Sequence, residues 1–106
     1  MNKPILFEIK DRIGHIILNS PPSNSMTKEF FIKFNKIVNS IDIKKISVLL
    51  IYSLNRHFSS GADIKELLTT IKNQVETDNF NKIIKYSDFL LSNNSAFLKI
   101  NSFDIP

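Results

Sequence analysis

Apolar and polar positions along the chain predict a short series of strands and helices. Residues 5–10 alternate between apolar and polar side chains, which is the period of a β-strand, and residues 15–19 predict a second strand. Residues 11–14 lie between them and predict the turn of an antiparallel hairpin, in which Gly14 can take a positive φ. The chain is therefore expected to open with a β-hairpin.

A helix is predicted after this hairpin, because apolar residues return at spacings of three and four. They are Phe30, Phe31, Phe34, Ile37, Val38 and Ile41. Such a stripe forms one face of an amphipathic helix, and Thr27 is placed to cap its N-terminus. We interpret the phenylalanines as core rather than as a cofactor site.

The most apolar run of the chain, residues 46–52, predicts a strand covered on both faces and placed at the centre of a sheet. A polar segment and Gly61 follow, and then Asp63 and Glu66 stand at capping-box spacing, which predicts a helix start. Residues 72–77 predict a loop, and Asp78 opens a further amphipathic segment. The element order β-β-α-β-α-α predicts an α/β fold.

The connection after the 46–52 strand is the main candidate for chemistry. Ligands of open α/β sheets bind beyond the carboxyl ends of the strands. Gly61 permits an unusual backbone angle there, and the side chain of Ala62 is too small to shield its own amide. A free amide in this place suits a developing oxyanion. A purely structural turn is the alternative, and from the pattern alone it is the commoner case.

Composition narrows the class of protein. The chain has 106 residues, which suits one small domain, and its formal net charge of +4 comes from lysines spread along the sequence. This spread does not favour a nucleic-acid-binding stripe. The chain has no cysteine, which excludes disulfides and thiolate metal sites and fits a cytoplasmic location. His15 and His57 lie in a strand and a loop, so no metal site is predicted, and no apolar run is long enough to span a membrane.

Other catalytic motifs are not supported. His57, Ser59 or Ser60, and Asp63 are the residue types of a hydrolytic triad, but the chain has no G-x-S-x-G elbow. Its two glycines are too few for a phosphate loop or a dinucleotide fingerprint.

The run F-S-S-G-A-D-I-K-E-L at residues 58–67 resembles the signature of the crotonase superfamily, the enoyl-CoA hydratases and isomerases. The segment from Asn19 to Asn24, with Pro21 and Pro22, also resembles that family, although no basic residue lies between the two asparagines. The resemblance implies a ClpP/crotonase-like ββα superhelix. It also implies that residues 1–106 are the N-terminal part of a crotonase-like domain.

The resemblance assigns the catalytic role here to the backbone N–H of Ala62, as one donor of an oxyanion hole. The residues it implies for substrate binding are Ser59, Ser60, Gly61, Asp63, Ile64 and Lys65. Backbone at Ser59 and Ser60 would border the adenine, Ile64 would pack against CoA, and Lys65 would lie near phosphate. In the family, the second amide and the acid/base glutamates follow a proline placed like Pro106, so we expect the 106-residue chain alone to be inactive.

The function implied is that of an enoyl-CoA hydratase or isomerase of fatty acid metabolism, acting on an acyl-CoA through an enolate. Hydration is the first choice, isomerisation the second, and dehydration or decarboxylation in polyketide-type pathways the third. No cofactor is expected apart from coenzyme A as part of the substrate. The complete protein is expected to be a cytoplasmic homo-oligomer, a trimer or hexamer, without membrane or nucleic-acid partners. The alternative is a truncated, non-catalytic module that binds a partner protein or RNA.

Overall fold

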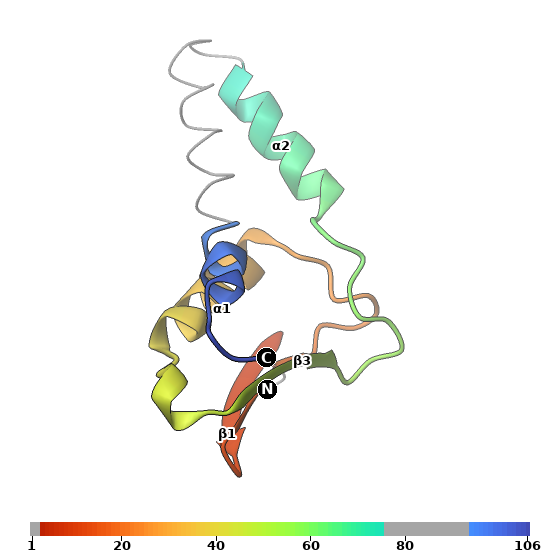
Figure 1. The fold of residues 1–106 in the computed structure, drawn as a ribbon. Coiled ribbons are helices and arrows are strands. Elements are labelled where there is room, and N and C mark those ends of the chain that lie inside the picture. Colours follow the sequence, from red (N-terminus) through yellow and green to blue (C-terminus); the bar gives the residue numbers. More distant parts are fainter. Residues whose placement is uncertain (1–2, 76–93) are drawn as a thin grey trace.

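A computed structural model of the chain describes residues 3–75 and 94–106. Its sheet has three strands in the order β1-β2-β3, with β1 at Ile5–Lys10, β2 at Ile13–Leu18 and β3 at Val48–Ser53 (Figure 1). Strands β1 and β2 are antiparallel, whereas β2 and β3 are parallel. The α/β class and the β-β-α-β-α order predicted for this part of the chain are confirmed.

The predicted hairpin is confirmed, but its turn is shorter than the expected residues 11–14, and Gly14 is not the residue with a positive φ. Asp11 and Arg12 take the positive φ angles, at 54° and 63°, and together form the two-residue connection. Gly14 lies inside β2 without a positive φ. A Cβ atom at Gly14 would lie 3.1 Å from Leu49 Cδ1 and 3.2 Å from Ile46 Cδ1, so this glycine serves the close packing of β2 on its neighbours.

The prediction that the strand at residues 46–52 lies at the centre of the sheet is wrong. Strand β2 is central, and β3 lies on the outside, where the Leu49 amide donates to the Pro106 carbonyl at 2.9 Å. The reason is topological. A two-residue turn keeps β1 beside β2, so a strand that returns through a helical crossover must pair at an open edge of this hairpin, and here it pairs with that of β2. Full burial is also wrong, because Leu50 is 42% exposed.

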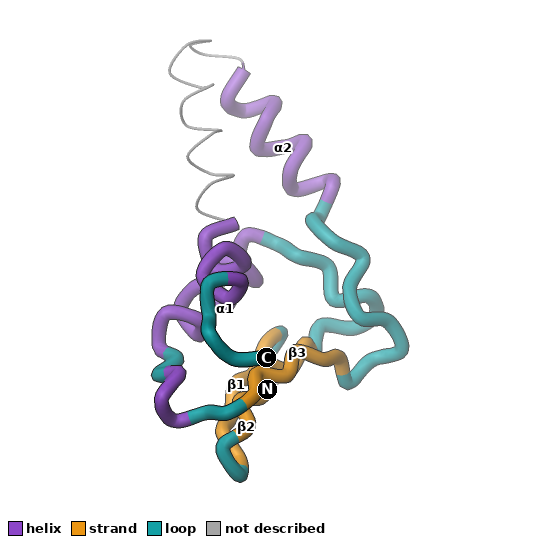
Figure 2. The backbone as a smooth tube through the Cα atoms, viewed as in Figure 1, coloured by secondary structure: helices purple, strands orange, loops and turns teal. Residues whose placement is uncertain are grey.

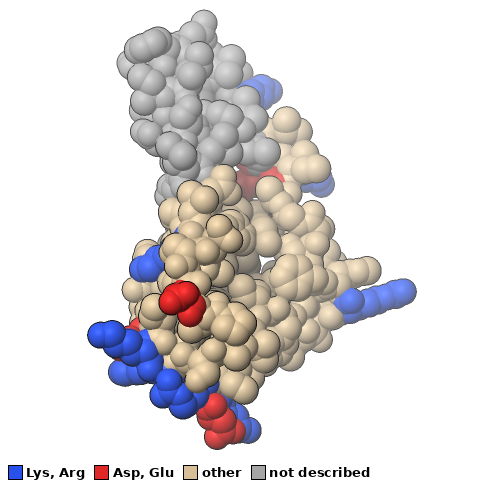
Figure 3. All heavy atoms as spheres, viewed as in Figure 1, with Lys and Arg blue, Asp and Glu red and all other residues tan. Residues whose placement is uncertain are grey.

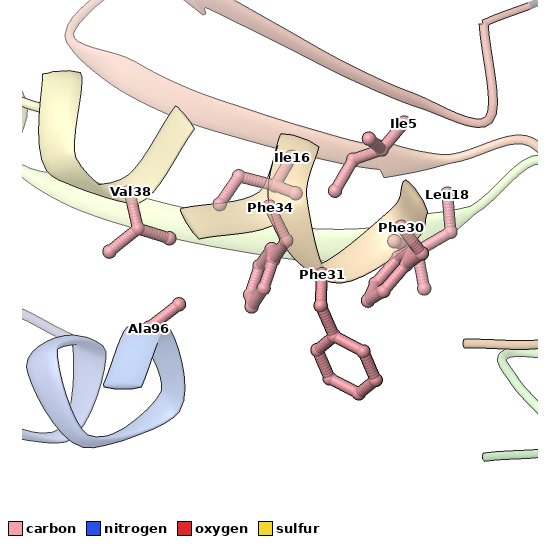
Figure 4. Packing of buried hydrophobic residues seen from close by; sticks show 8 residues of the cluster. All are labelled: Ile5, Ile16, Leu18, Phe30, Phe31, Phe34, Val38 and Ala96. Carbon is pink, nitrogen blue, oxygen red and sulfur yellow. The ribbon is translucent and has the colours of Figure 1, made fainter. Parts of the chain in front are cut away.

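Helix α1, Lys28–Ser40, covers one face of the sheet. Thr27 caps it as predicted, since its Oγ1 accepts a hydrogen bond from the Phe30 amide at 3.1 Å. The phenylalanine stripe is buried and forms the core together with side chains of β1, β2 and residues 94–101 (Figure 4). The buried cluster consists of Ile5, Ile16, Leu18, Phe30, Phe31, Phe34, Val38 and Ala96. Each of its fully buried large side chains contributes about 1.5–3 kcal/mol.

A helix at residues 94–101 packs against α1. Ala96 is buried, the ring centroids of Phe97 and Phe34 lie 5.1 Å apart, and Lys99 Nζ donates to Asn39 Oδ1 at 3.1 Å. Most of the amphipathic segment predicted from Asp78 onward lies outside the described residues. The part that is described is helical.

Helix α2, Ile64–Val75, extends away from the sheet (Figure 1). It continues through residues 72–75, so the predicted loop at residues 72–77 is wrong for these positions. The segment is polar but contains no glycine or proline to end the helix.

Candidate oxyanion site at the carboxyl ends of β2 and β3

Two loops leave the sheet at the same edge. Because β2 and β3 are parallel and Leu18 pairs with Ser53, the segments that follow them, residues 19–27 and 54–63, begin side by side (Figure 2). This is the edge at which open α/β sheets bind ligands. We call residues 58–63 the signature loop.

The two loops are joined by a short parallel pairing between Met26 and Ala62. The Met26 amide donates to the Gly61 carbonyl at 2.8 Å, and the Asp63 amide donates to the Met26 carbonyl at 3.1 Å. The Ser60 amide donates to the carbonyl of Ser23 at 2.8 Å. The signature loop is thus held by backbone bonds to the loop that precedes α1.

These bonds leave one amide of residues 60–63 without a partner. The Gly61 amide donates to Ser59 Oγ at 3.0 Å, and those of Ser60 and Asp63 donate as described. In a parallel pairing the bridged residue directs its own N–H away from the partner strand, and here that residue is Ala62. Within the described residues its amide makes no hydrogen bond, and Ala62 is exposed. It is available as a donor to a ligand.

Gly61 has the unusual backbone angle that the sequence predicted, with a φ of 87°. A Cβ atom there would meet no heavy atom within 4 Å. The glycine is therefore required by backbone conformation rather than by space.

Asn24, which the sequence analysis named only as the end of the segment that resembles the crotonase pattern, lies under this loop. It is 1% exposed and is the one buried polar residue in the described part of the chain. Its φ is 50°, a left-handed conformation that asparagine tolerates better than most residues. Its Oδ1 accepts from the Ser20 amide at 2.6 Å and from Asn55 Nδ2 at 3.2 Å.

The other end of this carboxamide reaches the segment after β3. Asn24 Nδ2 donates to Ser53 Oγ at 2.7 Å, to the Phe58 carbonyl at 2.8 Å and to the His57 carbonyl at 3.1 Å. The Ser59 hydroxyl returns a bond to the Asn24 carbonyl at 2.7 Å. The signal in the sequence is an asparagine that follows Pro21 and Pro22, because asparagine is a residue that readily closes such a turn with a left-handed backbone.

The predicted binding residues lie together in this region but differ in their surroundings. Ser59 is half-buried, and its hydroxyl serves the loop itself through Asn24 and Gly61. Ser60 is exposed, and its hydroxyl lies 3.2 Å from Ser23 Oγ. Ile64 is 69% exposed and Lys65 is also exposed, so both are accessible from solvent at the start of α2.

The capping box predicted at α2 is half correct. Asp63 Oδ1 accepts from the Glu66 amide at 3.0 Å, which makes Asp63 the N-cap. The Asp63 amide, however, donates to Met26, and Glu66 Oε1 accepts from the Lys28 amide of α1. Glu66 thus joins the first turns of two helices, because the short pairing at Met26 brings the start of α1 within its reach.

The two histidines are separate from the free amide. His15 Nδ1 lies 3.2 Å from the Tyr52 hydroxyl on the sheet, and the side chain of His57 is exposed. Within residues 3–75 and 94–106, no three His, Cys, Asp or Glu side chains are grouped so that they could hold a metal ion. None of the helices described there is both long and apolar enough to cross a membrane.

Comparison with known proteins finds similar sequences and folds, although no family model matches the chain. A peroxisomal Delta(3,5)-Delta(2,4)-dienoyl-CoA isomerase of Arabidopsis thaliana is 34% identical over 69 residues. The match covers 63% of this chain and 24% of that protein. An enoyl-CoA hydratase of Geobacillus kaustophilus has a similar structure, with a TM-score of 0.68 and 28% identity, over 91% of this chain and 33% of its own.

The chain carries the N-terminal portion of the crotonase-superfamily fold. A protein assigned as an enoyl-CoA hydratase/isomerase (crotonase) from Legionella pneumophila matches 97% of it with a TM-score of 0.72, at 19% identity. That match covers 38% of the Legionella chain. This crotonase-like chain therefore spans between about a quarter and two fifths of the proteins it resembles.

Proposed function

We propose that the Ala62 amide donates a hydrogen bond to the thioester carbonyl oxygen of an acyl-CoA. On this proposal, the full-length protein is an enoyl-CoA hydratase or isomerase. The observation that supports the proposal is the N–H of the exposed residue Ala62, at the carboxyl ends of two parallel strands, which donates to no acceptor among residues 3–75 and 94–106. The amides of Ser60, Gly61 and Asp63 donate to acceptors within the protein, whereas the Ala62 amide can donate to a ligand.

The chemistry explains why such an amide is useful. When water adds to the β-carbon of an enoyl thioester, or when a proton leaves the α-carbon, negative charge develops on the thioester oxygen. A donor fixed in advance stabilises this enolate without any rearrangement at the moment of reaction. The loss of one such donor typically costs about 2.7–4 kcal/mol of transition-state stabilisation.

Other residues of the loop have proposed roles that fit their exposure. The backbone of Ser59 and Ser60 borders the adenine, and the exposed Ile64 offers apolar surface to CoA. The exposed Lys65 lies where it can meet a phosphate. The proposal requires no cofactor beyond the coenzyme A of the substrate, and it includes a homo-oligomer as the state of the full-length protein.

Hydration is the proposed reaction, and isomerisation of a double bond is the second candidate. The second candidate is supported by the match to the plant dienoyl-CoA isomerase. Both reactions place negative charge on the thioester oxygen, so both need a donor at that atom. On the face shown in Figure 3, basic side chains lie at several places with acidic ones among them, which does not favour the alternative of an RNA-binding module.

The test is an NMR titration of the full-length protein labelled with ¹⁵N-alanine. Butyryl-CoA is compared with S-butyl-CoA, a thioether that has the same chain but lacks the carbonyl oxygen. We expect the Ala62 amide proton to move downfield with the thioester and much less with the thioether. Equal shifts with both ligands, or no binding of either, would refute the proposal.

A further inference from the structure

Asn24 holds both loops of the site through one side chain. Within the loop after β2, the Ser20 amide donates to Asn24 Oδ1 at 2.6 Å and the Asn24 amide donates to the Ser20 carbonyl at 2.7 Å. This reciprocal pair closes the turn that contains Pro21 and Pro22. The backbone of Asn24 is thereby fixed two residues before Met26.

The same side chain fixes the start of the signature loop. Its two N–H groups are aimed at Ser53 Oγ and at the Phe58 carbonyl, at 2.7 Å and 2.8 Å, and the His57 carbonyl shares them at 3.1 Å. A neutral carboxamide has two donors and an acceptor oxygen, and all are used here. Because the residue is 1% exposed, water cannot take the place of a lost partner.

The position of the free amide depends on this arrangement. The Met26–Ala62 pairing directs the Ala62 N–H outward, and this pairing holds only while the two loops keep their register. The bonds of Asn24 lie two residues before Met26 and four residues before Ala62. These bonds therefore help to fix which residues of the two loops pair with each other, and they do so from the buried side of the loops.

We infer that Asn24 is a positioning residue that fixes the signature loop so that the Ala62 amide faces the thioester oxygen. This inference rests on the proposed function. Its structural part, control of the loop, can be tested without any ligand.

The main variant is Asn24→Asp, which has nearly the same size and also tolerates a left-handed backbone. It replaces the two N–H donors with an oxygen that faces the carbonyls of His57 and Phe58 and repels them. The matched control is Asn39→Asp on the exposed side of α1. There the oxygen that accepts from Lys99 Nζ is retained.

The first measurement is amide hydrogen exchange of the free protein. Ser60, Gly61 and Asp63 are protected by their bonds, and in Asn24→Asp we expect their exchange to become at least about tenfold faster, the effect of losing an ordinary hydrogen bond. Exchange in Asn39→Asp should match the unmodified protein. Unchanged exchange in Asn24→Asp would overturn the inference. A loss of protection throughout β2 would overturn it too, because Asn24 would then support the whole fold rather than the loop.

The second measurement is the ratio of the affinities for butyryl-CoA and S-butyl-CoA. We expect Asn24→Asp to lower this ratio about tenfold while binding of the thioether changes little, because only the thioester uses the Ala62 amide. Asn24→Gly, which keeps the backbone angle but has no carboxamide, should show the same loss. If both variants keep the ratio, the inference is wrong. If the unmodified protein shows no preference for the thioester, the proposed function fails, and hydrogen exchange still decides the role of Asn24.

Discussion

The Ala62 amide is free because of the direction of its peptide group. The carbonyl of that peptide, at Gly61, accepts from the Met26 amide, so the Ala62 N–H on the opposite side points away from Met26. The turn before it has a φ of 87° at Gly61. A residue other than glycine would strain this turn. A donor held in this way loses little freedom when a ligand oxygen arrives, which is the condition for strong stabilisation of an oxyanion.

Replacing Ala62 by proline tests this donor directly. Proline removes the N–H, and we expect turnover of crotonyl-CoA by the full-length protein to fall about a hundredfold or more. The affinity for CoA should fall less, because the adenine and phosphate contacts lie elsewhere. The measurement is steady-state kinetics, with circular dichroism to confirm folding.

Ala62→Ser is the matched control for this substitution. Serine keeps the backbone N–H and adds only one small polar group, so its turnover should stay close to that of the unmodified protein. If a folded Ala62→Pro variant turns over substrate as fast as Ala62→Ser, the amide is not the donor and the loop is structural.

At the scale of elements, the start of α2 is tied to the start of α1. Asp63 caps α2, while Glu66 accepts a hydrogen bond from the Lys28 amide, one of the first N–H groups of α1 that have no partner within their own helix. A carboxylate is favourable there because the N-terminus of a helix carries partial positive charge. The first turns of α1 and α2 are thereby joined, and α2 directly follows the signature loop.

We expect Glu66→Ala to lower the free energy of unfolding by about 0.5–2 kcal/mol, the usual cost of losing a helix cap. Glu66→Gln should cost less, because an acceptor oxygen remains and only the charge is lost. The measurement is urea denaturation of the full-length protein. Glu29→Ala is the control, since Glu29 also lies in the first turn of α1 but its side chain is 69% exposed and forms an ion pair with Lys33. Equal effects of Glu66→Ala and Glu29→Ala would contradict the proposed link between the helices.

Signals from neighbouring residues predicted much of this structure, whereas contacts between residues far apart along the chain were not predicted. The Thr27 cap, the phenylalanine face of α1 and the left-handed Gly61 each follow from neighbouring residues. The outer position of β3 in the described sheet depends on which edge of the hairpin it pairs with. The local pattern of apolar residues contains no information on that edge. The role of Asn24 was missed because its partners on the other loop are 29 to 35 residues away along the chain.

For the molecule as a whole, the core and the site lie at different places and meet at Met26, which pairs with Ala62 and packs against the buried cluster. The core lies between α1 and the sheet, whereas the free amide lies at one edge, where both loops leave the parallel strands (Figures 2 and 4). The chain spans 33% and 38% of the two solved structures compared with it, so the activity of the whole protein must be tested on its full length.

The most direct test of the central claim is a crystal structure of the full-length protein with butyryl-CoA, a saturated thioester that cannot be hydrated. We predict that the thioester oxygen lies about 2.7–3.1 Å from the Ala62 nitrogen, the range expected for an oxyanion donor. A thioester oxygen beyond hydrogen-bond reach of Ala62, or an Ala62 amide bonded to another part of the protein, would contradict the account.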